Sequence, residues 1–548
     1  MTPPMVSPLD LADIQGNILF AYGKQGFPVG RLLLFNVSDA ARGRDFVEAV
    51  RPMVTTALRW PSKVNPHHAA STTTVAKPAV ALNIAFTFWG LVALKVSTRS
   101  LRGMPDEFID GMYARAHILG DDVPTNCIDD WDPVWKLPRD GPAHRPHIMI
   151  ALNAQITRTG APVPELDAIT EQLRQLCANS GRGVTLISGH RGAEPDYQAL
   201  SAIMTTAADG TVRPQPTEHF GFADGISDPV FVGQYPHTKE AVAVVGNGKI
   251  MPDQSWQPLA TGEFLLGHPD EAQEIAGLPM PLDFSRNGTF MACRKLHQNV
   301  VAFRRYLERT ALDFAAIMEI SPEEARDTLT AKMSGRWPDG VPLIAAGSFA
   351  EWQAFRQRRA DAARANDQAT LAAMDRALSE FMYRGDPAGA RCPAAAHTRR
   401  VNPRDMLDPR FSSPDPKQWN GSVLNNRRRI LRRGLPYGSV APDAADDSGE
   451  HGIVMLVVCA SLFRQFEFVT QQWLQYGLDS SVGNDTCPML GNHGSEAKFV
   501  IPADPAGGKP PFICDRLPQF VQTRGGDYFF VPSMTALRMI GTGIIDPT

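Results

Sequence analysis

The sequence predicts an α+β fold made of two halves, each an antiparallel β-sheet with peripheral helices on one face. In the first half, strand-like runs lie at 31–37, 80–86, 147–152 and 184–187, and helical patterns at 40–53, 90–96 and 164–178. The second half repeats this order loosely, with strand-like runs at 288–293 and 452–459 and helical patterns at 299–311 and 462–476. A strand–helix–strand order that occurs twice is typical of paired α+β units.

The apolar pattern justifies each element. Residues 80–86 form a short, nearly continuous apolar run, as expected for a buried strand. The predicted helices carry apolar residues three or four positions apart, which places those residues on one face. They are Phe46, Val47 and Val50 at 40–53, Leu166, Ile169, Leu173 and Leu176 at 164–178, Val300, Phe303, Tyr306 and Leu307 at 299–311, and Phe466, Val469 and Trp473 at 462–476.

The length of the chain predicts more than one domain. A chain of 548 residues is longer than one ordinary hydrophobic core supports. The irregular stretch at 235–250 is the predicted boundary, so we expect an N-terminal domain at 1–235 and a C-terminal domain at 236–548. Within the second domain, residues at about 345–390 are rich in Ala, Arg and Asp, which predicts a charged helical insertion without an assigned function.

The composition is that of an ordinary globular protein, with 43% hydrophobic residues, 20% charged residues and a net charge of −4. No basic patch dominates, so nucleic acid is not an expected partner. The most apolar run, 80–94, is too short to span a bilayer, and residues 1–14 do not resemble a secretory signal. The seven cysteines are scattered without a Cys-x-x-Cys pair or zinc spacing, which indicates reduced thiols. We therefore expect a cytoplasmic protein without a membrane partner.

The most informative stretch is residues 218–229, in which one carboxylate, Asp224, lies between Gly221 and Gly225. Glycines let the backbone turn sharply and approach a ligand closely, because they carry no Cβ. Phe222 and the phenylalanine two positions before it supply apolar walls. An acid on such a loop is a candidate proton-transfer group. An isolated pattern of this kind is more often a surface turn in which the Asp caps its own backbone.

Two further stretches add other functional groups. Residues 397–404 begin with His397, and residues 426–438 hold a run of arginines. Taken alone, His397 is more often a hydrogen-bonded structural histidine than a metal ligand, and the arginine run would indicate a phosphate-binding patch. No Gly-rich loop between a strand and a helix accompanies it, which argues against phosphate binding. Together, the three stretches supply an acid, a guanidinium and an imidazole.

These three stretches, with residues 14–19, resemble the hallmarks of the dye-decolorising peroxidase family. The likeness runs from about 13 to 540, with 345–390 as the main unmatched part, and continues at 262–267, 294–296, 335–340, 464–468 and 523–530. The resemblance implies two ferredoxin-like halves of the dimeric α+β barrel type, with haem b held in the second half. It also implies a peroxidase that uses hydrogen peroxide to form a ferryl-type haem and then oxidises bulky organic reductants such as dyes and phenolics.

The resemblance also assigns roles to residues. The proximal iron ligand maps onto His397, the distal acid onto Asp224 and the distal arginine onto Arg432. Arg433 is the alternative if the alignment there is shifted by one residue. The residues expected to bind the cofactor are His397, Arg432, Phe222, Gly225 and Ile226.

One departure from the family concerns the proximal histidine. The family usually keeps a carboxylate behind this histidine, but residues 459–462, where we expect it, are Cys, Ala, Ser and Leu. The hydrogen-bond partner of His397 is therefore left open by the sequence.

The expected chemistry divides the work among three side chains. A neutral imidazole is a good ligand for haem iron, so His397 would hold it. Asp224 would carry the proton between the two oxygens of peroxide, and Arg432 would stabilise the charge on the departing oxygen. A solvated Asp titrates near ~3.9, so activity at acidic pH is expected. The expected partners are hydrogen peroxide and a small-molecule reductant, and a homo-oligomer is left open.

Other interpretations need different residues. A haem carrier or sensor without peroxidase turnover is the alternative function, but simple binding needs neither Asp224 nor Arg432. His219 and His451 are alternative iron ligands. Candidate electron relays, for each of which a place in the core is the simpler interpretation, are Trp256, Trp337, Trp419, Trp473 and Tyr437.

Overall fold

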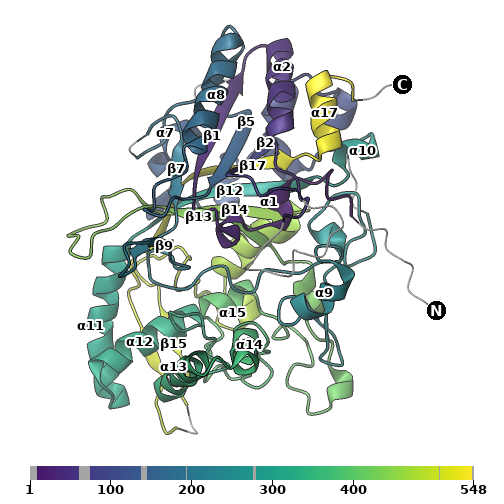
Figure 1. The fold of residues 1–548 in the computed structure, drawn as a ribbon. Coiled ribbons are helices and arrows are strands. Elements are labelled where there is room, and N and C mark those ends of the chain that lie inside the picture. Colours follow the sequence, from purple (N-terminus) through teal and green to yellow (C-terminus); the bar gives the residue numbers. More distant parts are fainter. Residues whose placement is uncertain are drawn as a thin grey trace.

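One antiparallel sheet of nine strands runs through the part of the chain that the computed structural model describes, which is residues 9–60, 75–136, 145–192, 194–275, 279–504 and 507–545. Figure 1 shows this sheet across the middle of the molecule. The strands follow the order β13 (Leu431–Gly438), β14 (His451–Cys459), β12 (Thr289–Gln298), β17 (Val521–Val531), β2 (Val80–Phe86), β5 (Ile148–Ala154), β1 (Val29–Val37) and β6 (Val184–Leu186), and β7 (Gln198–Ser201) also pairs with β1.

The two halves of the chain build this sheet in the same way. In each half, the order along the sheet is second, third, first and fourth strand: β2-β5-β1-β6 in the first half and β13-β14-β12-β17 in the second. This is the ferredoxin-like order, so the predicted α+β fold with antiparallel sheets is confirmed. The sequence did not indicate that the two sheets join, which they do through one pairing of Phe86 with Phe530. At the other end, β7 contacts β13, so the sheet curves back on itself.

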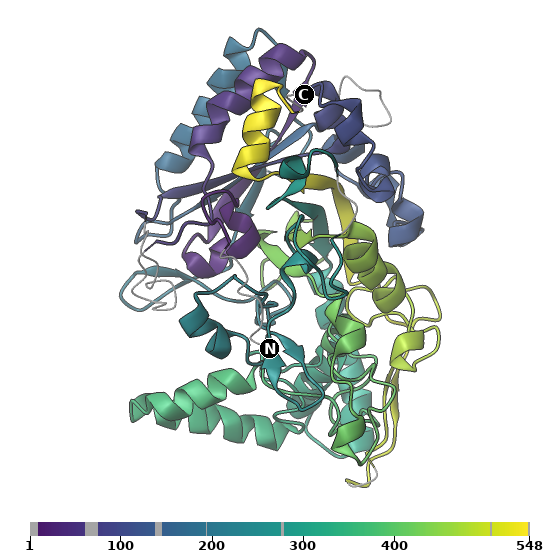
Figure 2. The same cartoon turned by 90° about the vertical axis from the view of Figure 1, so that its right-hand side faces the viewer.

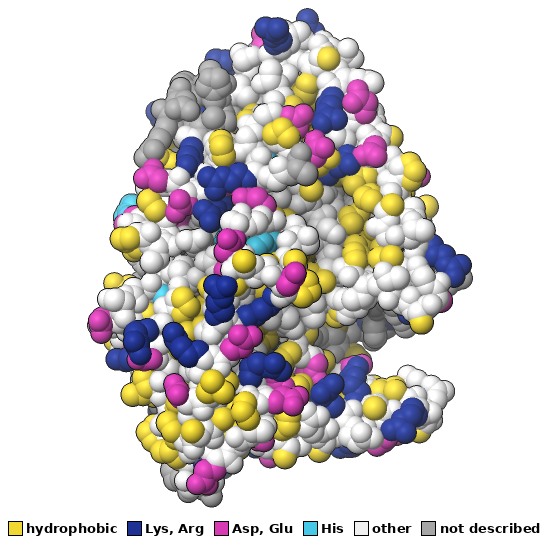
Figure 3. Space-filling model, turned by 90° about the vertical axis from the view of Figure 1, so that its left-hand side faces the viewer, with side chains coloured by type: hydrophobic (Ala, Val, Ile, Leu, Met, Phe, Trp, Pro, Cys, Tyr) yellow, Lys and Arg dark blue, Asp and Glu magenta, His cyan; other side chains and the backbone are white. Residues whose placement is uncertain are grey.

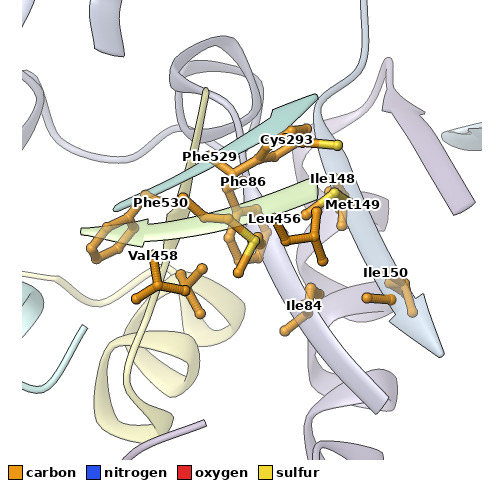
Figure 4. Packing of buried hydrophobic residues seen from close by; sticks show 14 of the residues in the cluster. Ile84, Phe86, Ile148, Met149, Ile150, Cys293, Leu456, Val458, Phe529 and Phe530 are labelled. Atoms are coloured by element: carbon orange, nitrogen blue, oxygen red, sulfur yellow. The ribbon is translucent and has the colours of Figure 1, made fainter. Parts of the chain in front are cut away.

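Side chains, more than backbone pairing, hold the junction of the two halves together. Gln15 is fully buried there, and its Nε2 donates hydrogen bonds of 2.9 Å to the carbonyls of both Ile84 and Pro532. Burying one large apolar side chain stabilises the fold by ~1.5–3 kcal/mol. Figure 4 shows the apolar side chains from both halves that pack at this junction, among them Ile84, Phe86, Ile148, Leu456, Val458, Phe529 and Phe530.

Helices cover one face of the first-half strands. Two of them, α2 (Ala40–Val50) and α8 (Glu165–Asn179), were predicted from their apolar faces. A third, α3 (Phe88–Ala93), follows β2 and overlaps the helix predicted at 90–96. The last helix, α17 (Met534–Thr542), packs against α2 (Figure 1). The end of the chain therefore returns to the first half.

The second half carries a long segment between its first helix and its second strand. The first helix, α11 (Val300–Met318), is longer than predicted. The segment that follows holds α12 (Pro322–Ser334), α13 (Phe349–Arg364), α14 (Gln368–Ala377) and α15 (His397–Val401). The α13–α14 hairpin is the predicted charged insertion, and it projects from the body of the molecule (Figure 2). Figure 3 shows the hollow that separates this projection from the rest of the molecule.

The predicted helix at 462–476 is present in an unusual form. It consists of two consecutive π-helical segments, Leu462–Glu467 and Val469–Leu474. Such wide turns occur frequently at functional sites. No helix among the described residues is long and apolar enough to cross a bilayer.

The remaining elements are short. The helices are α1 (Gly16–Leu19), α4 (Thr98–Leu101), α5 (Asp106–Asp110), α6 (Ala116–Leu119), α7 (Pro133–Lys136), α9 (His237–Ala243), α10 (Leu282–Ser285) and α16 (Val423–Asn426). The paired strands outside the main sheet are β3 (Asp122–Val123) with β4 (Asn126–Cys127), β8 (Met204–Thr206) with β9 (Val212–Pro214), β10 (Lys249–Ile250) with β11 (Trp256–Gln257), and β15 (Phe499–Ile501) with β16 (Phe512–Cys514).

Candidate active site

A cavity of about 680 Å³ brings the three functional stretches of the sequence together. Asp224, Arg432 and His397 all line it, as do the predicted cofactor contacts Phe222, Gly225 and Ile226. Its walls are mostly apolar, which suits a large planar ligand. The apolar lining residues include Phe220, Leu296, Val401, Leu435, Val454, Met455, Phe466, Val469, Leu474, Met489, Leu490 and Val521.

The loop that carries Asp224 is held by its first residue, Glu218. The buried carboxylate of Glu218 accepts hydrogen bonds of 2.9 Å from the backbone N–H groups of Phe220 and Phe222, and it also accepts one from Gln298. Burial raises the pKa of Glu218 to about 7, although these hydrogen bonds oppose the rise. Gly221 and Gly225 have φ values of +94° and +76°, so both turns depend on glycine as the sequence predicted.

Asp224 and Arg432 form an ion pair at the cavity, although 208 residues separate them in the chain. Arg432 Nη1 lies 2.8 Å from Asp224 Oδ1, which also accepts the Gly225 N–H at 2.6 Å. Both side chains keep accessible surface, 44% for Asp224 and 41% for Arg432, and both line the cavity. Burial raises the pKa of Asp224, but Arg432, the Gly225 N–H and Lys24 outweigh burial and leave that pKa below its ordinary value. The carboxylate is therefore ionised at neutral pH.

The neighbouring arginine on β13, Arg433, also lines the cavity and lies 3.6 Å from Asp228, but its other contacts differ from those of Arg432. Arg433 is buried, and its guanidinium donates to the carbonyls of Asn17 and Ile18 at 3.0 and 3.1 Å. Because successive strand residues point to opposite faces, only one of the two arginines meets Asp224. That arginine is Arg432, and Arg433 ties β13 to the N-terminal segment.

His397 begins α15, a helix of five residues that its two arginines anchor. Arg400 is almost fully buried and donates to the carbonyls of Trp473, Asp485 and Tyr476. Arg399 donates to Asp386 and to the Cys392 carbonyl. The short helix is thereby fixed at the cavity wall.

The imidazole of His397 has one occupied and one free nitrogen. Its Nδ1 lies 3.3 Å from the sulfur of Cys487, and Nε2 makes no hydrogen bond within the described part of the chain. The partner of His397 thus comes from outside the 459–462 segment where the sequence comparison led us to expect it.

The alternative histidines lie elsewhere. His219 Nε2 contacts the Tyr437 carbonyl at 3.0 Å, and its ring meets that of His451 edge to face, with a centroid distance of 5.7 Å. Of the described histidines, only His397 is among the residues that line the cavity.

Among the candidate electron relays, only Trp337 lines the cavity. Its ring stacks on Trp352 of α13 with a centroid distance of 4.5 Å and an interplanar angle of 4°. Trp352 in turn donates its indole N–H to the Asp339 carboxylate. Trp337 therefore links the cavity to the base of the helical hairpin.

A cluster of buried guanidinium groups near Ser227 was not expected from the sequence. Arg336 and Arg404 both donate to the Ser227 hydroxyl, at 3.2 and 3.4 Å, and Arg336 and Arg429 line the cavity. None of these three arginines forms an ion pair with a described carboxylate. Burial lowers their pKa values, to about 10 for Arg336 and Arg429 and to about 9 for Arg404.

This cluster indicates an excess of positive charge at the cavity edge. Arg404 is close enough to both Arg336 and Arg429 for the like charges to contribute to the lowering. Buried charges normally have partners, so such a cluster fits an anionic group of a ligand. The signal in the sequence was that each arginine falls in one of the motif stretches, at 335–340, 397–404 and 426–438.

Comparison with known proteins identifies close counterparts of this architecture. Residues 13–189 match the family model described as the DyP dimeric alpha+beta barrel domain. The chain is 28% identical to a dye-decolorizing peroxidase of Mycena epipterygia and 26% identical to Peroxidase 2 of Mycetinis scorodonius, and each alignment covers 97% of this chain and 87% of the relative. It is also similar to the solved structure of an ancestral D-type dye decolorizing peroxidase, with a TM-score of 0.67 and 25% identity over 97% of this chain and 99% of that chain.

Proposed function

We infer that this chain belongs to the dye-decolorising peroxidase family and is a peroxidase. We propose that it binds haem b in the 680 Å³ cavity and uses hydrogen peroxide to oxidise bulky organic reductants such as dyes and phenolics. The observation that carries this proposal is the ion pair of Asp224 and Arg432, which faces the same cavity as His397. A carrier or sensor has no use for such a pair.

The residues around the cavity fit haem b in three ways. The apolar walls suit the porphyrin ring, and His397 offers a nitrogen without another partner to the iron. The two carboxylates of haem b match the guanidinium groups of Arg336 and Arg429 at the cavity wall and of Arg404 beside them, which donate to backbone carbonyls but form no ion pair within the described part of the chain. His397 would hold the iron, with Phe222, Gly225, Ile226 and Arg432 as further contacts.

When bound, the haem supplies the iron on which peroxide is reduced. Asp224 moves the proton from one peroxide oxygen to the other. Oδ1 of Asp224 is engaged by Arg432 and Gly225, whereas Oδ2 has no hydrogen bond within the described part of the chain, so we assign the proton transfer to Oδ2. Such a group contributes ~10²–10⁴-fold to a rate.

Arg432 stabilises the negative charge that develops on the departing oxygen, which then leaves as water. The guanidinium is always protonated and is already fixed by Asp224, so it needs no reorganisation during the reaction. Phe220 and Phe222 supply apolar surface that limits the access of water to the pair.

We also propose that the chain divides at 235, with the Asp224 loop contributed by the first part and His397 and Arg432 by the second. In support, the strands of the two ferredoxin-like units come from 29–201 and 289–531. The free cysteines, most of them buried, are in keeping with the proposed cytoplasmic location.

A visible absorption spectrum of the purified protein supplied with hemin tests the proposal. Wild type is expected to give a ferric haem spectrum that changes with one equivalent of peroxide and to oxidise a phenol or dye only when peroxide is present. His397→Ala is expected to lose haem or to give an altered spectrum. A protein that takes up no hemin, or a His397→Ala spectrum identical to that of wild type, would contradict the proposal.

A further inference from the structure

The sulfur of Cys487 occupies the position beside His397 in which a carboxylate was expected. We propose that Cys487 is a positioning residue for the haem: its sulfur accepts the Nδ1–H of His397, orients the imidazole and makes it a weaker electron donor to iron than a carboxylate partner would. This inference rests on the proposed role of His397 as the iron ligand and concerns how that ligand is tuned.

The proposed binding of iron by His397 sets the direction of the hydrogen bond. A neutral imidazole carries its proton on one nitrogen only, and the nitrogen that binds a metal is the one without the proton. Nε2 of His397 is free to bind iron, so Nδ1 carries the hydrogen, and the Cys487 sulfur lies 3.3 Å from it. Partners of this kind set both the orientation and the donor strength of a metal-bound histidine.

The backbone holds the sulfur in place. The Cys487 N–H donates to the carbonyl of Leu474, at the end of the second π-helical segment, at 2.7 Å. Its own carbonyl accepts the Gly491 N–H at 2.9 Å and contacts His493 Nε2 at 3.0 Å. Because the residue is fully buried and tied at both ends of its peptide, the thiol has little freedom to turn away from His397.

The nearby carboxylates have other partners. Asp485, two residues before Cys487, lies 3.9 Å from Lys498, and Asp479 accepts the indole N–H of Trp473 at 2.9 Å. In the segment where a carboxylate was expected, Ser461 accepts the Arg464 N–H at the start of the π-helix. No described carboxylate forms an ion pair or a hydrogen bond with His397.

The choice of sulfur has a chemical consequence. Sulfur is a weak hydrogen-bond acceptor, whereas a carboxylate forms short, charge-assisted bonds. A strong acceptor draws the Nδ1 proton away and makes the imidazole more anionic, which strengthens its bond to iron and favours ferric iron. A sulfur partner should therefore leave a weaker iron–histidine bond and a higher reduction potential than a carboxylate partner.

The test uses the full-length protein loaded with hemin. The iron–imidazole stretching frequency of the ferrous protein is measured by resonance Raman spectroscopy, and the ferric/ferrous reduction potential is measured by spectroelectrochemistry. Cys487→Asp should raise the frequency and lower the potential, and Cys487→Ala should change both in the opposite direction. Cys514→Ala is the matched control, because Cys514 is fully buried in the same apolar cluster but contacts Tyr306 instead of His397.

The outcomes separate this inference from the proposed function. Suppose that the iron–imidazole stretching band is present in wild type and absent in His397→Ala, but that Cys487→Asp and Cys487→Ala match the Cys514→Ala control in frequency and potential. Cys487 then has no positioning role, and the proposed function still holds. If wild type shows no iron–imidazole band, both fail. Should Cys487→Asp not retain haem, Cys487→Ser takes its place: a shift from wild type in either quantity that Cys514→Ala lacks supports the proposal, and no shift overturns it.

Discussion

The two halves of the molecule share one strand order but differ in what their second strands face. In the first half, the second strand, β2, is buried along its whole length. In the second half, the corresponding strand, β13, alternates between buried and accessible residues. Its accessible residues Arg432, Gly434 and Pro436 line the cavity, and the buried Arg433 and Leu435 reach it as well. The same topology thus encloses a continuous apolar core in one half and borders a site in the other.

The difference comes from one connection. The link between the first helix and the second strand spans 51–79 in the first half and 319–430 in the second. The longer link brings α15 and His397 to the cavity wall. The buried residues of β13 pack in the interior of the second half, and its accessible residues can therefore carry charged groups that face the cavity. Substitutions on the cavity face should change chemistry, and substitutions on core faces should change stability.

Among the substitutions that test this comparison, Asp224→Asn should have the largest effect. Asp224→Asn keeps the shape of the side chain but removes the base, so we expect the rate constant for reaction with peroxide to fall by ~10²–10⁴-fold with haem retained. Stopped-flow absorbance of the haem after mixing with peroxide measures this rate. Asp209→Asn, in an exposed turn of the same half, is the control and should react as wild type does. A rate for Asp224→Asn within threefold of wild type would remove Asp224 from the mechanism.

Arg432 and Arg433 are adjacent residues of β13, so they test the comparison within one strand. Arg432→Leu removes a fixed cation from the cavity. The transition-state stabilisation that kcat/KM for peroxide reports should therefore fall by about 3–4 kcal/mol, with little change in the free energy of unfolding. Arg433→Leu leaves the Asn17 and Ile18 carbonyls without their donor and should lower that free energy by about 3 kcal/mol. Steady-state kinetics and chemical denaturation of both variants measure the two effects.

Ile84→Ala on β2 is the matched control from the first half. This side chain is buried at the junction of the sheet, so its truncation should destabilise the protein by ~2–5 kcal/mol while the remaining folded enzyme keeps its kcat/KM. The comparison fails if Arg433→Leu is stable but inactive and Arg432→Leu is active.

The strands that sequence predicted well are those with uninterrupted apolar runs. The run at 80–86 is β2 residue for residue, and 452–459 lies within β14. The strand β13 was missed because arginine, glycine and proline occupy its cavity face, and β17 because Gly525 and Gly526 interrupt its pattern. In both strands, the residues that hide the strand from a periodicity analysis are set by what the strand faces.

The candidate site was predictable only where a motif carried it. The pairing of Asp224 with Arg432 followed from two recognisable stretches. The contact of Cys487 with His397 was not predictable, because a lone cysteine 90 residues after His397 carries no signal until the fold brings the two together. The cluster of Arg336, Arg404 and Arg429 likewise exists only through tertiary packing, since each residue alone is an ordinary arginine.

A smaller effect is expected from that cluster. Arg336→Leu and Arg404→Leu each remove one proposed partner of the haem carboxylates, so hemin affinity should fall by ~10–100-fold, as expected for one or two charge-assisted hydrogen bonds. Each substitution also takes a donor from backbone carbonyls, those of Gly340 and Leu378 for Arg336 and that of Phe381 for Arg404, so the unfolding temperature of the haem-free protein should fall as well and is measured separately. Hemin titration followed by absorbance measures the affinity, with Arg364→Leu on the exposed side of α13 as the control. Unchanged affinity in both variants would mean that the cluster does not serve haem.

The smallest expected effect is a shift in pH dependence. Arg432, the Gly225 N–H and Lys24 together outweigh burial and keep the pKa of Asp224 low, so the ionised form persists below the ordinary range and the rate falls only as the pH drops through the lowered value. The stability that the ion pair adds follows the same sign: it is present above the unfolded-state pKa of the carboxyl group and is lost as the pH falls through the folded value. Lys24 contributes least among these groups, because it is half exposed and pairs with Asp228.

Lys24→Met should therefore move the acid limb of the peroxide-dependent kcat/KM to slightly higher pH, and Arg432→Leu should move it further in the same direction. The pH profile of each variant, normalised to its own maximum, separates this shift from the loss of rate. Lys417→Met, at an exposed position in the turn Pro416–Gln418, should leave the limb in place. A limb that stays fixed in both Lys24→Met and Arg432→Leu would mean that a group other than Asp224 limits the rate at acidic pH, and the assignment of the proton transfer to Asp224 would then be wrong.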